Sequence, residues 1–244
     1  MVLALSRAYA SCAGTQCGDK GNPHMILNHI APTVALLFVA SATAAAQPAA
    51  RAVDRAVAAY EKLSTLRAEF TQTITNPLIS TRLTARGEFV RRAPNLLSIT
   101  FSDPAGDRIV ADGEAVWVYL PSSAPGQVMK FSASNGAATR MDPASQFLTE
   151  PRTRFTISDA GISSVRGRPT RQVVLVPRQS NGTFTRARVW IDEQDSMIRQ
   201  FEITEPSGLV RHVVITRLQP NVAVRSSVFE FTPPQGARVI DQSR

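Results

Sequence analysis

Residues 87–101 read GEFVRRAPNLLSITF and have the pattern of a β-hairpin. Apolar and polar side chains alternate on both sides of Ala93-Pro94-Asn95, which indicates strands over 83–91 and 96–102 joined by a tight turn. Leu97, Ile99 and Phe101 fall on one face of the second strand because side chains alternate between the faces. The stretch therefore predicts two antiparallel strands with a charged, proline-containing corner between them.

The same pattern of short strands and turns continues along most of the chain. Period-two alternation begins at Leu66 and runs to Ile74, and turn signals such as Asp112-Gly113 and Ser180-Asn181-Gly182 separate the later strands. Connections of hairpin length favour an antiparallel sheet, which we expect to have about 11 strands. Beyond the hairpin, the predicted strands are 107–112, 115–120, 127–132, 154–158, 171–177, 184–192, 197–204, 209–218 and 228–231.

Two helices interrupt this pattern. Residues from Ala49 onward read ARAVDRAVAAYEKLSTL, which predicts an amphipathic helix of about 16 residues. Its apolar face carries Val53, Val57, Tyr60 and Leu63. Asp142 and Pro143 then form a helix-start signal before a short helix over 144–149 that presents Phe147 and Leu148. With no linker or repeat inside 47–244, we predict one domain of the α+β class, mainly β.

The first 46 residues have the pattern of a leader. An apolar run from Ile30 to Val39 is followed by Ala44-Ala45-Ala46, which predicts a signal peptide cleaved after Ala46. A membrane-spanning helix would need about 20 apolar residues, more than this run provides. Met25 is an alternative start, and both cysteines fall before it. We therefore expect an exported domain without thiols.

Charge and residue usage disfavour several classes of function. The chain has 27 basic and 19 acidic residues, but its arginines are dispersed without basic runs, which disfavours nucleic-acid binding. His212 is the one histidine after residue 46, so a zinc site or a histidine-based triad lacks ligands and partners. The carboxylates mostly flank turns and form no recognisable acid–base motif. We predict a protein that is not an enzyme and has no metal and no cofactor.

Four stretches together resemble the periplasmic outer-membrane lipoprotein carrier family, LolA. They are GEFVRRAPN at 87–95, FTQ at 70–72, DGEAVWVYLP at 112–121 and FEFTPPQGARVIDQ at 229–242, and their order and spacing agree over nearly all of 50–242. The resemblance implies an unclosed β-barrel, a strongly curved antiparallel sheet covered by the helices and enclosing an apolar cavity. Residues 47–244 would form a single lipoprotein-carrier domain.

The same resemblance implies a function and partners. Family members take the acyl chains of lipoproteins released by an inner-membrane ATP-binding-cassette transporter and deliver them to an acceptor at the outer membrane. We accordingly expect a monomer in the periplasm whose cargo is acylated lipoproteins. Two alternatives stay open: a periplasmic adaptor of the same fold that binds another lipid or a protein, and a secreted hydrolase with an unrecognised carboxylate site.

Applied to this sequence, the resemblance nominates residues for three roles. An acyl-chain cavity would be lined by Phe89, Leu97, Ile99, Phe101, Trp117 and Tyr119, although core packing would produce the same alternation. The lid would be formed by Val53, Val57, Tyr60, Phe147 and Leu148. The family closes its lid with an arginine directly before the hairpin proline, where this chain has Ala93. Either the turn redirects Arg92 into that role, with Arg91 as a further candidate for lid or partner contact, or closure works differently.

Overall fold

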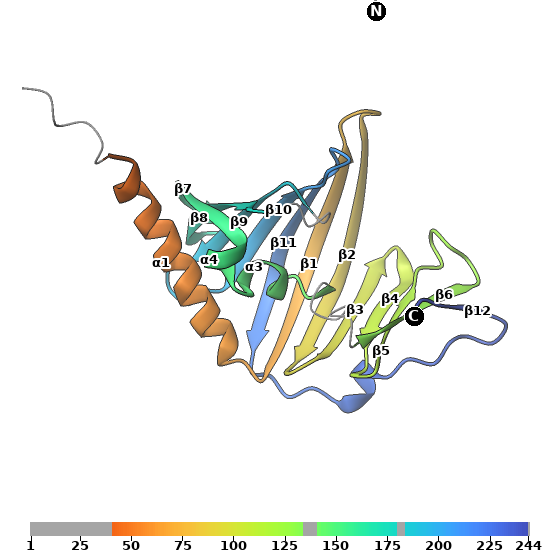
Figure 1. Ribbon diagram of the computed structural model, residues 1–244. Coiled ribbons are helices and arrows are strands. Elements are labelled where there is room, and N and C mark those ends of the chain that lie inside the picture. The colour runs from red at the N-terminus through yellow and green to blue at the C-terminus, as the bar shows by residue number, and fades with distance from the viewer. Residues whose placement is uncertain (1–40, 134–140, 180–183, 244) are drawn as a thin grey trace, which may run out of the picture. The chain divides into compact units, whose positions relative to one another are not determined.

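A single curved sheet of twelve strands organises the part of the chain that the structure describes, residues 41–133, 141–179 and 184–243 of a computed structural model (Figure 1). The strand order is β12-β6-β5-β4-β3-β2-β1-β11-β10-β9-β8-β7. All neighbours are antiparallel except β12 and β6. Strands β12 and β7 stand at opposite ends of the order, so the sheet does not close on itself. The predicted mainly-β, unclosed fold is confirmed.

The strand bounds follow the hairpin pattern of the sequence. The strands are β1 Thr65–Asn76, β2 Thr81–Arg92, β3 Leu96–Asp103, β4 Ala105–Ala111, β5 Ala115–Tyr119, β6 Gln127–Ser132, β7 Phe155–Val165, β8 Arg168–Pro177, β9 Arg186–Asp192, β10 Ile198–Thr204, β11 Val210–Pro220 and β12 Arg238–Asp241.

The sequence prediction is wrong at the C-terminal end. Residues 228–231 do not form a strand, because Ser226–Phe229 is a 3-10 helix (η2) whose Phe229 is buried. Pro233 and Pro234 follow and cannot donate the hydrogen bonds of a sheet ladder. The chain pairs again only at β12, which the sequence did not predict, beside β6.

The long helix α1, Ser41–Glu61, begins earlier than predicted and packs on β7, β8 and β9 (Figure 1). Ala49, Ala52 and Ala56 are fully buried, and these small side chains let the helix approach the sheet closely. Val53 is buried beside them, as its helical spacing predicts. Neither this helix nor any other in the described residues is long and apolar enough to cross a membrane.

The predicted short internal helix is present, followed by a second one. Helix α3 is Ser145–Leu148 and helix α4 is Pro151–Arg154, and Glu150 between them adopts a left-handed conformation with φ 46°. Phe147 is fully buried and packs edge-on against Phe201, with ring centroids 5.3 Å apart. This contact attaches the short helix to the β10 part of the sheet.

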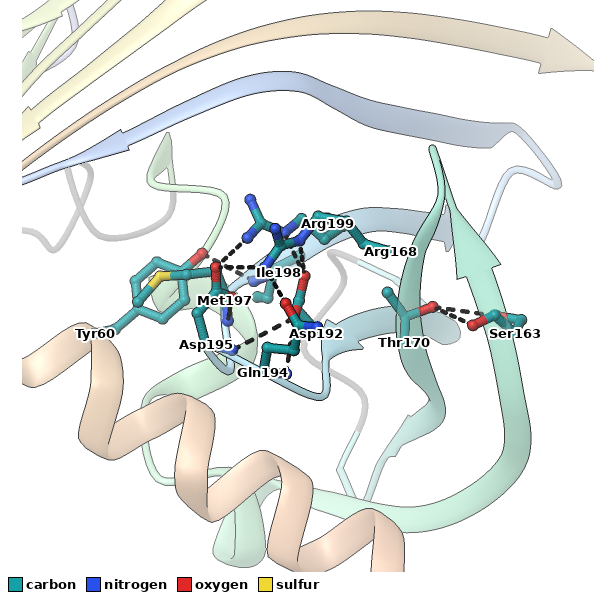
Figure 2. A network of polar contacts seen from close by, with 10 residues as sticks. All are labelled: Tyr60, Ser163, Arg168, Thr170, Asp192, Gln194, Asp195, Met197, Ile198 and Arg199. Carbon is teal, nitrogen blue, oxygen red and sulfur yellow. Dashed lines mark hydrogen bonds and ion pairs between the residues drawn. The ribbon is translucent and has the colours of Figure 1, made fainter.

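The turn between β9 and β10 is held by a buried carboxylate (Figure 2). Asp192 accepts hydrogen bonds from Arg168, from Arg199 Nε at 2.9 Å and from the backbone N–H of Gln194 at 2.8 Å. Burial disfavours the charged form of this carboxyl, but these donors outweigh burial and lower its pKa to about 2. The network fixes the end of β10, which contributes to the site described next.

Candidate apolar binding site

A cavity of about 290 Å³ lies on the inner face of the sheet. Its walls come from β1, β2, β3, β4, β10 and β11, and residues Met141, Pro143, Ala144 and Gln146 lie against it. Most of its lining side chains are apolar, among them Phe70, Phe89, Ile99, Phe101, Ile109, Phe201, Val213, Ile215 and Leu218. A concave apolar surface of this kind suits a hydrocarbon ligand.

Aromatic packing shapes the centre of the cavity. The rings of Phe70 and Phe101 meet edge to face with centroids 5.7 Å apart. Gly87 lies beneath them, where an added Cβ would be 2.5 Å from the carbonyl oxygen of Thr100 and 3.0 Å from the Phe70 ring. Glycine at this position therefore lets the two rings pack directly over the strand.

The residues Met141–Leu148, here called the lid segment, are ordered by Asp142. Its carboxylate accepts hydrogen bonds from the backbone N–H of Ala144 at 2.9 Å and from the Ser145 hydroxyl at 2.6 Å. Arg91 Nε on β2 lies 3.4 Å from the same carboxylate. One carboxylate thus organises the start of the lid segment and ties it to the sheet.

Tyr60, at the end of α1, joins the helix to the other side of the cavity. Its buried hydroxyl accepts a hydrogen bond from the backbone N–H of Ile198 at 3.3 Å. Burial strongly raises the pKa of this phenol, so Tyr60 stays neutral at physiological pH. A neutral side chain is compatible with the apolar lining that it contributes to.

Polar residues mark one rim of the cavity. Arg211 donates to Glu205 at 3.1 Å and to Gln72 at 3.5 Å, and all three residues line the space. Within the described part of the chain no group of three or more His, Cys, Asp or Glu side chains is placed to hold a metal ion. The site therefore consists of an apolar interior with a charged rim.

The structure separates the residues nominated for the cavity into two groups. Phe89, Ile99 and Phe101 line it, and Leu97 is buried in the adjoining core. Trp117 and Tyr119 lie on the opposite face and pack against Phe231, with ring centroids 5.7 and 6.2 Å apart. Their nomination for the cavity is corrected, because Val116 and Val118 carry the inward parity of β5.

The residues nominated for the lid lie on the inner side of the sheet. Tyr60 lines the cavity, and Val53 and Val57 belong to the core beneath α1. Phe147 and Leu148 are buried, while the neighbouring Met141, Pro143, Ala144 and Gln146 contact the cavity itself. Sequence reasoning missed these four, although the helix-start signal at Asp142 marked their location.

The two hairpin arginines point to opposite faces. Arg92 donates to the Ser226 hydroxyl at 3.3 Å and to the Val224 carbonyl, and its guanidinium lies 5.1 Å from the Phe229 ring centroid. Arg92 therefore holds the C-terminal segment on the outer face, and its nomination as the lid-closing residue is corrected. Arg91 contacts the lid segment because it shares the parity of Ala93, two residues later.

Comparisons with known proteins agree on one family. The sequence pattern described as "Outer membrane lipoprotein carrier protein LolA" matches residues 61–232. A protein of Leptothrix cholodnii named outer-membrane lipoprotein carrier protein is 28% identical over 177 residues, covering 72% of this chain and 79% of its own. One of the same name from Salmonella paratyphi A is 27% identical over 195 residues, covering 80% of this chain and 90% of its own.

Solved structures show the same fold at low sequence identity. An uncharacterised conserved protein of Thermus thermophilus superposes with a TM-score of 0.53 at 16% identity, covering 80% of this chain and all of the other. The Mycobacterium tuberculosis lipoprotein LppX gives 0.50 at 14% identity, covering 74% of this chain and 98% of its own. These two similarities concern architecture.

Proposed function

We propose, from the premise that this chain belongs to the outer-membrane lipoprotein carrier family, that its apolar cavity holds the acyl chains of lipoproteins. The protein is a lipoprotein carrier. The observation that carries the cavity assignment is the continuous apolar lining of the inner face beside the lid segment. The polar rim of Arg211, Glu205 and Gln72 would leave the polar part of a cargo in contact with water.

The energetics of acyl chains explain why a carrier is needed. An acyl chain of roughly 15 methylenes at about 0.8 kcal/mol each represents on the order of 12 kcal/mol of transfer free energy, so a free lipoprotein is poorly soluble in water. A carrier must shield these chains and then release them. Shielding and release require a reversible apolar surface and no bond-making residue.

The closed lid segment provides a means of release. Ligand pockets typically measure roughly 300–1,000 Å³, so a cavity of about 290 Å³ must widen to admit several acyl chains. We infer that widening moves the lid segment and breaks the contact between Arg91 and Asp142. Reforming that contact favours the empty state and offsets part of the gain from acyl-chain burial.

The carrier role also suggests where the protein works and which partners it meets. We propose that the protein is exported with cleavage after Ala46 and works in the periplasm as a monomer. An ATP-binding-cassette transporter of the inner membrane would load it, and an acceptor at the outer membrane would unload it. The carriers of Leptothrix and Salmonella named above support this setting.

Two neighbouring residues of β11 offer a matched test of the cavity. Ile215 lines it, whereas Thr216 lies next to it on the opposite face. We expect Ile215→Trp to fill the cavity and weaken binding of a triacylated peptide at least about tenfold, and Thr216→Trp to leave binding unchanged. Displacement of a fluorescent acyl probe measures both affinities. Binding of free fatty acid without any binding of acylated peptide would contradict the carrier role.

A further inference from the structure

The hairpin formed by β1 and β2 reaches past the strands on either side (Figure 1). On one side the pairing of β1 with β11 stops at Thr75. On the other side the pairing of β2 with β3 stops at Arg86, so residues 81–85 have a partner only in β1. The tip, residues 76–83, therefore projects from the sheet without support from neighbouring strands.

This tip carries large apolar side chains that nothing covers in the described chain. Leu78 is 81% exposed, Ile79 is 66% exposed and Leu83 is 68% exposed. The turn holds the first two outward, because the Asn76 carboxamide accepts a hydrogen bond from the Leu78 N–H at 3.0 Å and Ser80 has φ 51°. An exposed apolar group of this kind on a folded domain marks an interaction site.

The charged residues of the β1–β2 hairpin beyond Phe70 and Gly87 are both basic, and the nearest carboxylate on β3 is that of Asp103, the register partner of Arg86. Residues 70–87 contain Arg82 and Arg86 and no Asp or Glu. Neither arginine forms an ion pair with a carboxylate of the described residues, and both are exposed. The nearby Glu205 is already paired with Arg211. An apolar tip flanked by free guanidinium groups complements a surface that is apolar inside and anionic outside.

We propose that this tip docks on the surface of an anionic phospholipid membrane. Leu78 and Ile79 enter the acyl boundary, and Arg82 and Arg86 bind lipid phosphates. A protein groove would bury apolar side chains equally well, but two flanking arginines that form no ion pair within the described residues favour a uniformly negative partner.

The position of the tip relative to the cavity supports a membrane as the partner. Ile74 and Leu83 are cross-strand neighbours on the same face as Phe70 and Phe89. The cavity rim at Gln72 and Arg211 lies between them and the cavity interior. On β2, however, this face carries Leu83, Ala85, Gly87 and Phe89, which have no polar side chain. This row runs past the rim and joins the docked tip to the cavity, along the path by which an acyl chain would leave or enter a bilayer.

Vesicle binding tests the proposal directly. The protein is recovered as its host exports it, so all variants share the same N-terminal processing, and it is mixed with vesicles of phosphatidylethanolamine and phosphatidylglycerol. We expect binding that weakens with salt and is lost on pure phosphatidylcholine. The double variant Leu78→Asp/Ile79→Asp should bind at least about tenfold more weakly, and Arg82→Gln/Arg86→Gln should lose most of the salt dependence.

A matched control uses an exposed apolar residue elsewhere. Ile162 on the edge strand β7 is 67% exposed, and Ile162→Asp should bind vesicles like the unaltered protein. Wild-type binding by the tip variants, or equal loss with Ile162→Asp, would overturn the proposal. If the tip variants lose lipoprotein delivery but still bind vesicles, the proposal is also overturned, because the tip would then contact a protein. The assay contains no lipoprotein, so its outcome is separate from that of the cavity test.

Discussion

Gly87 is the residue on which the centre of the cavity depends most strictly. We expect Gly87→Ala to lower the free energy of unfolding by about 1–3 kcal/mol, because the new Cβ meets backbone atoms of Thr100 and Phe101 that cannot turn aside. Denaturant unfolding measures the change. Ala85→Val, two residues earlier on the same strand face and partly exposed, is the control. An unchanged unfolding midpoint for Gly87→Ala would refute the close packing described here.

Arg91 and Arg92 differ by one position, and we expect them to differ in function. Arg91→Leu removes the contact with Asp142, favours the open lid segment and should tighten acyl-peptide binding by about tenfold while slowing release. Asp142→Asn should shift binding in the same direction, because it removes the charge that Arg91 contacts. The start of the lid segment should stay ordered, because the amide oxygen can still accept a hydrogen bond from the Ala144 N–H. Probe displacement and release kinetics are the measurements.

Arg92→Leu is the matched control for that pair. It should leave acyl-peptide affinity unchanged and lower the thermal midpoint, because Arg92 holds Val224 and Ser226 on the outer face. The reverse pattern, with Arg92→Leu altering affinity and Arg91→Leu having no effect, would contradict the assignment of Arg91 to the lid segment.

Residue roles were only partly predictable from the sequence, and the reason is physical. Alternation correctly grouped Phe89, Ile99 and Phe101 on one face. It could not show which face of β5 is inward, because β5 has packing partners on both faces and apolar residues occupy both parities. Trp117 packs beneath Phe231, which is far away in sequence, and its indole N–H donates to Asp112 at 2.7 Å. The packing of Phe231 over Trp117 is a long-range contact, which only the folded structure reveals.

At the scale of elements, hairpins were predictable and the C-terminal segment was not. Strands joined by short turns pair with their sequence neighbours, so local patterns give both their existence and their order. Ser226–Phe229 instead lies across β3 and is held by contacts such as Arg108 with the Val228 carbonyl at 3.1 Å. The pairing of β12 with β6 depends on these long-range contacts. Local sequence periodicity cannot predict contacts of this kind.

The buried Asp192 at the β9–β10 turn should make the free energy of unfolding depend on pH (Figure 2). The folded-state pKa of Asp192 is about 2, below its ordinary value of 3.8, so the folded state disfavours protonation. Its contribution, roughly 2 kcal/mol, is therefore fully present above about pH 4 and is lost as the pH falls toward 2.

We expect Asp192→Asn to be less stable by roughly 2 kcal/mol at pH 7, and to differ less from the unaltered protein as the pH falls from 4 to 2. Urea unfolding at several pH values measures the difference between the two proteins, in which the titration of other carboxylates largely cancels. A constant difference from pH 7 to pH 2 would contradict the role of the charged carboxylate.

For the whole molecule, an unclosed sheet allows a cavity to change size. A closed barrel fixes its interior through hydrogen bonds around the full circumference, whereas this sheet ends at β12 and β7. The cavity is bounded partly by the lid segment, which Arg91 and the packing of Phe147 hold on the sheet. We therefore expect binding and release to move this short segment at the open side of the sheet, while the strands keep their pairing.

The carrier role makes a final prediction in the cell. Depletion of the protein should cause outer-membrane lipoproteins to accumulate in the inner membrane, because their acyl chains cannot cross water unshielded. Re-expression of the unaltered chain should restore sorting, and Ile215→Trp should not, because its filled cavity cannot load cargo. Arg91→Leu should instead accumulate as a complex with lipoprotein, since loading is intact and release is slowed. Membrane fractionation and co-purification distinguish these outcomes, and unchanged sorting after depletion would contradict the carrier role in this cell.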